Sequence, residues 1–252
     1  FETRSKIRHR NSPACTLPRV HRSVYFFLEK VDRSVYFLLT GLAQSQNIQE
    51  RWRHKMPNFN DFSFKAQPWY NEAEFRPLFA KAVSLNTIVI HCFDPRASEI
   101  PAVVAKHFGE VYPGENVLDE AGNRVGHTTT LFPVSVAGGR AVAGVQSIAT
   151  MVHLFGIKRV VVVHHSFCGA TSFTNEGIID AFKHEHGSDI SSAFDHDSIC
   201  ISDFATSLKY DVGVVRANPG VPANVEIYGF FYNIDTLELT EVVSDIPDQA
   251  EA

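Results

Sequence analysis

The chain has 252 residues, 44% of them hydrophobic, which suffices for one sizeable core and allows one or two domains. Its four cysteines, at positions 15, 92, 168 and 200, are too few and too widely spaced for a secreted disulfide scaffold, so we expect a reducing, cytoplasmic setting. No apolar run is long enough for a membrane helix, and the acidic net charge of -5 argues against a nucleic-acid partner.

Residues 1 to about 60 differ from the rest. Residues 1–55 hold 11 Lys/Arg and 4 Asp/Glu, a net of +7, whereas the remainder holds 12 and 24, a net of -12. The segment begins with Phe1, and its first methionine is Met56. It fits a targeting peptide, which would make the protein mitochondrial, an interfacial membrane helix, or a disordered extension upstream of a start at Met56. We favour the last, and we divide the chain into an extension, 1–60, and a domain, 61–252.

The domain begins with helical patterns around a first strand. Residues 71–83 show apolar spacing typical of a helix, with Asn71 as N-cap and with a kink or a late start at Pro77. A β-branched run over 86–90 predicts a buried strand. Ser98 is the expected cap of a helix that runs through Lys106 and ends at Gly109.

Residues 110–130 contain turn formers and no hydrophobic period, which indicates a surface insertion. Residues 131–136 predict a strand whose Pro133 suits a sheet edge, and Gly138-Gly139 is expected to open a helix to about residue 155. The run 160–163 is purely valine and predicts a strand buried on both faces.

The C-terminal part completes the fold class. Residues 178–200 are polar and predict a helix followed by a loop, 203–208 are helical, and 224–243 predict two antiparallel strands. The alternation of strands and helices predicts an α/β fold, in which a mostly parallel sheet is flanked by helices and closed by an antiparallel C-terminal edge hairpin.

Soft metal ligands follow both buried strands. His165 and Cys168, three apart, come directly after the valine run, and Cys92 ends the first strand. Ligands in open α/β sheets bind beyond the carboxyl ends of strands, so we expect these three side chains to meet there. Two thiolates and one imidazole suit zinc, and a three-residue ligand set leaves one position open, as in catalytic sites.

Two motifs carry a resemblance to a known family. Cys92, Asp94 and Arg96 form a strand-ending C-x-D-x-R, and His165 and Cys168 form a later H-x-x-C. In this order they resemble the β-class carbonic anhydrases, and the likeness covers roughly residues 71 to 245. The chain is identified as a divergent member of that family.

The resemblance implies reversible hydration of carbon dioxide to bicarbonate by a zinc-bound hydroxide. Cys92, His165 and Cys168 are the implied zinc ligands, and Asp94, held ionised by a bidentate pair with Arg96, is the implied catalytic partner of the hydroxide. Asp94 is also a possible ligand in a resting state. The family further implies a homodimer or larger homo-oligomer.

Departures from the family pattern bear on activity and substrate. Pro95 stands where Ser or Ala is common, and Ser135-Val136 replaces an Arg-Asn pair before Gly138 and Gly139, which we expect to contact substrate. Two alternatives stay open: a hydrolase for carbonyl sulfide or carbon disulfide with the same ligands, and a zinc-containing bicarbonate-binding protein without turnover.

Overall fold

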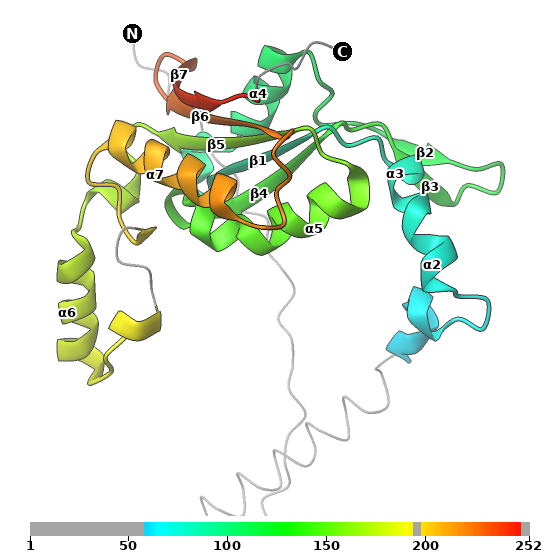
Figure 1. The fold of residues 1–252 in the computed structure, drawn as a ribbon, viewed down its shortest axis with the longest axis horizontal. Coiled ribbons are helices and arrows are strands. Elements are labelled where there is room, and N and C mark those ends of the chain that lie inside the picture. Colours follow the sequence, from blue (N-terminus) through cyan, green and yellow to red (C-terminus); the bar gives the residue numbers. More distant parts are fainter. Residues whose placement is uncertain (1–57, 194–197, 248–252) are drawn as a thin grey trace, which may run out of the picture. The chain divides into compact units, whose positions relative to one another are not determined.

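The computed structural model describes residues 58–193 and 198–247 (Figure 1). The chain divides into two compact units, Phe1–Gln67 and Pro68–Ala252. In the described part of the first unit, two short 3₁₀ turns follow one another, η2 (Phe59–Phe62) and η3 (Phe64–Ala66). The predicted extension over 1–60 lies almost entirely outside the described residues and stays a prediction.

The second unit is built on a five-stranded sheet in the order β4-β1-β5-β6-β7. The strands are β1 (Thr87–Cys92), β4 (Leu131–Val136), β5 (Arg159–His165), β6 (Glu226–Asn233) and β7 (Glu238–Asp245). The first four in spatial order pair in parallel, and β7 pairs antiparallel to β6. The predicted fold class is therefore confirmed. Pro133 lies in β4, at an edge of the sheet, where its missing N–H is tolerated.

Helices cover both faces of the sheet. In Figure 1, α4 (Ile100–Phe108) lies on one side, and α5 (Val145–Phe155) and α7 (Phe204–Ala217) lie on the other. Alternate valines of β5 serve the two layers, because Val161 and Val163 pack with α4 while Val160 and Val162 pack with α5 and α7. All four are fully buried, as predicted for a strand covered on both faces.

The helix predicted over 71–83 is broken into three short pieces. These are α2 (Glu72–Phe75), the 3₁₀ turn η4 (Arg76–Leu78) and α3 (Phe79–Ala82). The Asn71 side chain accepts a hydrogen bond from the backbone N–H of Ala73 at 3.1 Å, which confirms the predicted N-cap. Pro77 lies in the break, as expected, because it has no N–H for the helical ladder.

Two predicted helix starts are wrong. Ser98 does not cap α4, whose N-cap position is Glu99 and has no side-chain capping bond, although the helix ends at Gly109 (φ 66°) as predicted. Gly138-Gly139 does not open a helix. The two glycines have φ of 64° and 69°, outside the right-handed helical region. The chain makes the turns η6 (Ala137–Gly139) and η7 (Ala141–Gly144) there, before α5 begins.

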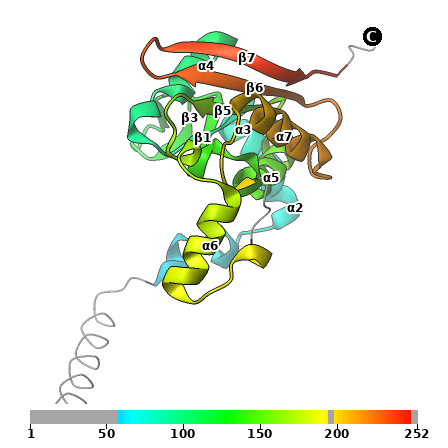
Figure 2. The same ribbon diagram turned by 90° about the vertical axis from the view of Figure 1, so that its left-hand side faces the viewer.

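The remaining elements lie at the periphery. The predicted insertion at 110–130 is an exposed hairpin, β2 (Asn116–Leu118) and β3 (Arg124–His127). After the turn η8 (Gly169–Thr171), α6 (Asn175–His186) projects away from the sheet in both views (Figures 1 and 2) and is followed by η9 (Ser191–Ala193). None of the helices in the described ranges has the length and apolar character needed to span a bilayer.

Candidate metal centre

The site lies where two neighbouring strands end. β1 ends at Cys92 and β5 ends at His165, and because these strands are parallel neighbours, both ends lie at the same edge of the sheet. Cys168 follows in the turn that leads into η8. Phe167, between the two motif residues, has a positive φ of 55°, a left-handed backbone conformation that helps to turn the chain sharply back toward β1.

The structure brings the three expected ligand side chains together. Their ligand atoms all lie within 4.8 Å of one another, and the sulfurs of Cys92 and Cys168 are 3.8 Å apart. All three residues are buried. Two sulfurs bound to one tetrahedral zinc at about 2.3 Å would lie about 3.8 Å apart, so the observed separation fits a zinc ion.

His165 is oriented for ligation. Its Nδ1 lies 2.9 Å from the backbone carbonyl of Ser166, and since a carbonyl only accepts hydrogen bonds, Nδ1 carries the proton. Nε2 is buried and has no hydrogen-bond partner among the described residues. The Ser166 backbone N–H and hydroxyl are in turn bound to the Tyr232 carbonyl and the Ile234 N–H, which anchors this loop to β6. An orphaned, buried imidazole nitrogen facing two sulfurs is what a metal ligand requires.

The electrostatics of the cluster favour positive charge at its centre. A hydrogen bond from Cys168 lowers the pKa of Cys92 to about 4, and the same bond raises the pKa of Cys168. Burial lowers the pKa of His165, but the neighbouring Cys92 thiolate and the Ser166 carbonyl outweigh it and raise the pKa overall. The lowered pKa of Cys92 favours its thiolate, and the raised pKa of His165 shows that a positive charge is stabilised beside it. Such an environment suits a soft divalent cation.

Asp94 and Arg96 form the expected pair next to this cluster. Arg96 donates from Nε to Asp94 Oδ1 at 3.0 Å and from Nη2 to Oδ2 at 2.6 Å. These bonds lower the pKa of Asp94 to about 2, so the carboxylate is ionised at neutral pH. Asp94 Oδ2 lies 3.9 Å from His165 Nε2, and Arg96 Nη2 also bonds the Phe167 carbonyl at 2.9 Å. Arg96 thereby links the two motif segments.

Pro95 does not disrupt this pair. It occupies the first position of the 3₁₀ turn η5 (Pro95–Ala97), where its backbone nitrogen has no donor role in the turn. Asp94 caps the same turn by accepting a hydrogen bond from the backbone N–H of Arg96 at 3.0 Å. The substitution noted in the sequence therefore suits the local backbone.

A cavity of about 370 Å³ adjoins the sulfurs of the cluster. Besides Cys92, Asp94 and Cys168, it is lined mainly by apolar residues, including Ala137, Ala170, Phe173 and Ile199. Gly138 also lines this cavity. Gly139 does not line it, and it packs instead against the backbone of Val163 and Cys92. A Cβ at Gly139 would lie 2.6 Å from the Val163 carbonyl oxygen and 3.1 Å from the Cys92 nitrogen. Gly139 thus permits close contact between the η6 turn and both ligand-bearing strands.

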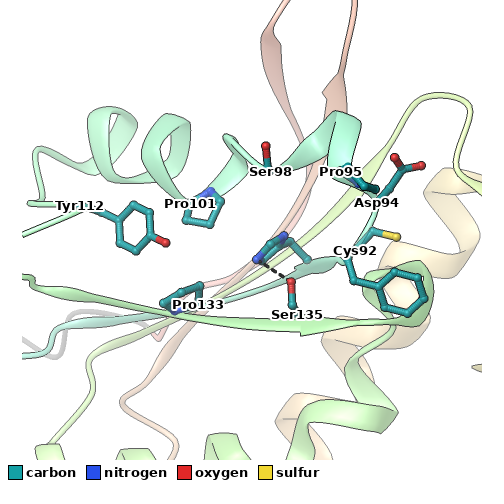
Figure 3. Close-up of a pocket in the computed structure, with 10 residues that line it drawn as sticks. Cys92, Asp94, Pro95, Ser98, Pro101, Tyr112, Pro133 and Ser135 are labelled. Carbon is teal, nitrogen blue, oxygen red and sulfur yellow. Dashed lines mark hydrogen bonds between the residues drawn. The ribbon is translucent and has the colours of Figure 1, made fainter. Parts of the chain in front are cut away.

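A second cavity, of about 290 Å³, lies between α4 and β4 (Figure 3). Tyr112, Pro101 and Ser98 line one side, Pro133 and Ser135 line the other, and Cys92 and Asp94 mark one end (Figure 3). The dashed line in Figure 3 is a 3.2 Å hydrogen bond between Ser135 and His91. This bond joins the buried His91 of β1 to the neighbouring strand β4.

A buried polar cluster was missed by sequence reasoning. His164 lies 2.9 Å from Asp211, which in turn pairs with Arg140 at 2.8 Å. The available signal was Asp211 itself, since it stands among Leu208, Val212 and Val215 on the apolar face of α7. An acid at such a position requires buried partners.

The fold and this cluster define a class of protein: a mostly parallel α/β protein with a Cys2His group and an open cavity at the carboxyl edge of its sheet. No protein-family model matches the chain. Curated relatives do: it is 26% identical over 98 residues to β-carbonic anhydrase 1 of Mycobacterium tuberculosis and of Mycobacterium bovis. The match covers 39% of this chain and spans 58% of the length of those relatives.

Solved structures give further likenesses. The chain is similar to a carbonic anhydrase from Streptococcus mutans, at 24% identity and a TM-score of 0.48, over 75% of this chain and 99% of that one. It is also similar to an apo carbon disulfide hydrolase, at 18% identity and a TM-score of 0.46, over 71% of this chain and 86% of that one. The curated relatives confirm the predicted resemblance to the β-class carbonic anhydrases, at low sequence identity.

Proposed function

We propose that this protein is a zinc-dependent carbonic anhydrase that reversibly hydrates carbon dioxide to bicarbonate. The observation that carries the proposal is the meeting of Cys92, His165 and Cys168, whose ligand atoms lie within 4.8 Å of one another at the ends of two parallel strands. Three protein ligands leave one coordination position for solvent, which is the arrangement of catalytic zinc sites.

Cys92, His165 and Cys168 would hold the ion. When bound, zinc supplies a Lewis acid that lowers the pKa of water to near neutrality. The chain keeps His165 in the right tautomer through the Ser166 carbonyl, and it keeps the sulfurs in a buried, partly apolar environment.

Asp94 would accept a hydrogen bond from the attacking water and orient it. Its carboxylate is ionised and held by Arg96, and its Oδ2 faces His165 Nε2 at 3.9 Å. Both oxygens are engaged by Arg96, which favours this orienting role over direct ligation of zinc. We assign the catalytic roles to Asp94 and Arg96 on this basis.

The adjoining cavity favours a small uncharged substrate. Its walls at Ala137, Phe173 and Ile199 are apolar, and Gly138 leaves room beside them. Carbon dioxide, carbonyl sulfide and carbon disulfide are all small and uncharged. Hydrolysis of the sulfur-containing gases is therefore the alternative activity, and the assay below separates them.

We extend the proposal to a homodimer or larger homo-oligomer. Phe93 and Phe167 flank the ligands in sequence and are 65% and 71% exposed, which is high for two aromatic side chains. A second copy of the chain would cover them. Light scattering at micromolar concentration tests this point, and a monomer would contradict it.

The decisive experiment combines metal analysis with two turnover assays on the full chain. We expect about one zinc per chain, stopped-flow proton release from carbon dioxide, and no hydrogen sulfide release from carbonyl sulfide or carbon disulfide. Sulfide release without carbon dioxide hydration would support the hydrolase instead. Zinc with neither activity would leave a bicarbonate-binding protein, and a protein without zinc would refute the proposal.

A further inference from the structure

A buried carboxylate lies between the sheet and α7, on the face that α5 and α7 cover. Asp211, on α7, is fully buried. Its Oδ2 accepts hydrogen bonds from Arg140 Nε at 2.8 Å and from His164 Nε2 at 2.9 Å, and its Oδ1 accepts one from the backbone N–H of Ala141 at 3.2 Å. Since a carboxylate only accepts, His164 carries its proton on Nε2.

The first segment that Asp211 holds is the end of β5. His164 and His165 are consecutive in this strand, so their side chains point to opposite faces. His165 meets the two sulfurs, while the His164 side chain leaves the strand on the other face and is bound to α7. The bond to Asp211 therefore restrains the strand at the position of the expected zinc ligand.

Arg140 extends the restraint to two more segments. It follows the Gly138-Gly139 turn, which packs on the backbone of Cys92, and its Nη1 donates to the Cys200 carbonyl. The residue after Cys200, Ile201, packs against the side chains of Cys92 and Cys168. Ile201 N–H also donates to the Ala170 carbonyl at 2.9 Å, beside the cavity.

One carboxylate thus joins, directly or through Arg140, three segments that border the candidate metal centre. Packing alone does not account for it, because apolar residues of similar volume often stabilise a core as well as a buried ion pair does. Unlike apolar contacts, the hydrogen bonds of a carboxylate are directional, so they set the relative positions of the groups that donate to it.

We propose that Asp211, acting through His164 and Arg140, is the positioning residue that preorganises the zinc ligands. The inference rests on the proposed function, since it assumes that Cys92, His165 and Cys168 bind zinc. It concerns residues that do not touch the metal or the substrate.

The test is Asp211→Asn, with Asp245→Asn as a matched control. An asparagine keeps the shape of the aspartate side chain. Its NH2 group, however, would face N–H donors that now bond the carboxylate, and the negative charge that faces Arg140 is lost. In the control, Asp245 at the end of β7 also accepts hydrogen bonds from an arginine. The donor is Arg216 of α7, at 2.8 and 3.1 Å, and this pair lies away from the site. Circular dichroism confirms that each variant is folded.

Two readouts report on ligand geometry rather than on turnover. Zinc affinity is measured by competition with a chromophoric chelator, and the cobalt-substituted protein is examined by its absorption spectrum. We expect Asp211→Asn to weaken zinc binding about 10–100-fold, as is usual when a residue that orients a ligand is lost, and to alter the cobalt spectrum. Asp245→Asn should match the wild type in both.

Arg140→Lys gives a second variant that keeps the charge. Lysine has one terminal nitrogen and lacks the planar fork by which Arg140 bonds Asp211 through Nε and the Cys200 carbonyl through Nη1, so we expect the same direction of change. If Asp211→Asn does not fold, Arg140→Lys decides. A folded variant with wild-type zinc affinity and cobalt spectrum would overturn the inference alone, whereas a wild type that binds no zinc would end it together with the proposed function.

Discussion

Gly139 offers a quantitative test of how the η6 turn supports the metal centre. Its φ is 69°, and a Cβ there would lie 2.6 Å from the Val163 carbonyl oxygen and 3.1 Å from the Cys92 nitrogen. Both contacts are with backbone atoms of the ligand-bearing strands. Gly139→Ala should therefore push the turn away from β1 and β5.

Gly156, the C-cap of α5, is the matched control. It has nearly the same φ, 65°, but a Cβ there would meet nothing within 4 Å. A left-handed conformation costs a non-glycine residue about 1–2 kcal/mol, and this is the whole cost expected for Gly156→Ala. Gly139→Ala adds overpacking, worth about 1–3 kcal/mol.

Thermal unfolding followed by circular dichroism measures the difference. At about 2–4 °C per kcal/mol for a domain of this size, Gly139→Ala should unfold about 2–12 °C below Gly156→Ala. It should also bind less zinc, because the Cys92 backbone moves. Equal Tm values for the two variants, with full zinc content in both, would refute this account of the turn.

Three further predictions concern the ligands, the Asp94 pair and the start of α7. Cys168→Ser should abolish zinc binding and carbon dioxide hydration, whereas Cys200→Ser, a buried cysteine outside the cluster, should retain both. Arg96→Lys should keep its zinc but lose about 10–100-fold in kcat/KM, because lysine lacks the planar fork that donates in parallel to the two Asp94 oxygens; an unchanged kcat/KM would count against the proposed pair. The hydrogen bond from the backbone N–H of Thr206 lowers the pKa of Asp203 in the folded state. The ionised Asp203 therefore stabilises the fold fully above its unfolded pKa, and this stabilisation is lost as the pH falls through its folded pKa. The difference in the free energy of unfolding between the wild type and Asp203→Asn should accordingly become smaller at acidic pH. Urea titrations in which this difference does not depend on pH would contradict the prediction.

Several elements could be predicted because their cause is local. The β-branched valine run at 160–163 favours a buried strand, and Asn71 and Gly109 mark helix ends by capping chemistry that needs no distant partner. Ser98 and Gly138 show the limit of this reasoning. Both residue types suit a helix start, but the backbone that they adopt depends on the strands beside them.

The sequence by itself determined the strand-helix alternation and placed Cys92, His165 and Cys168 at strand ends, because hydrophobic period and donor chemistry are written in short stretches. Only the tertiary structure decided that Asp211 meets residues 71 and 47 positions away, Arg140 and His164, and that Ser135 meets His91. The physical reason is that such pairs depend on the order and register of strands across the sheet. Those are selected by the burial of the whole core, which no local pattern specifies.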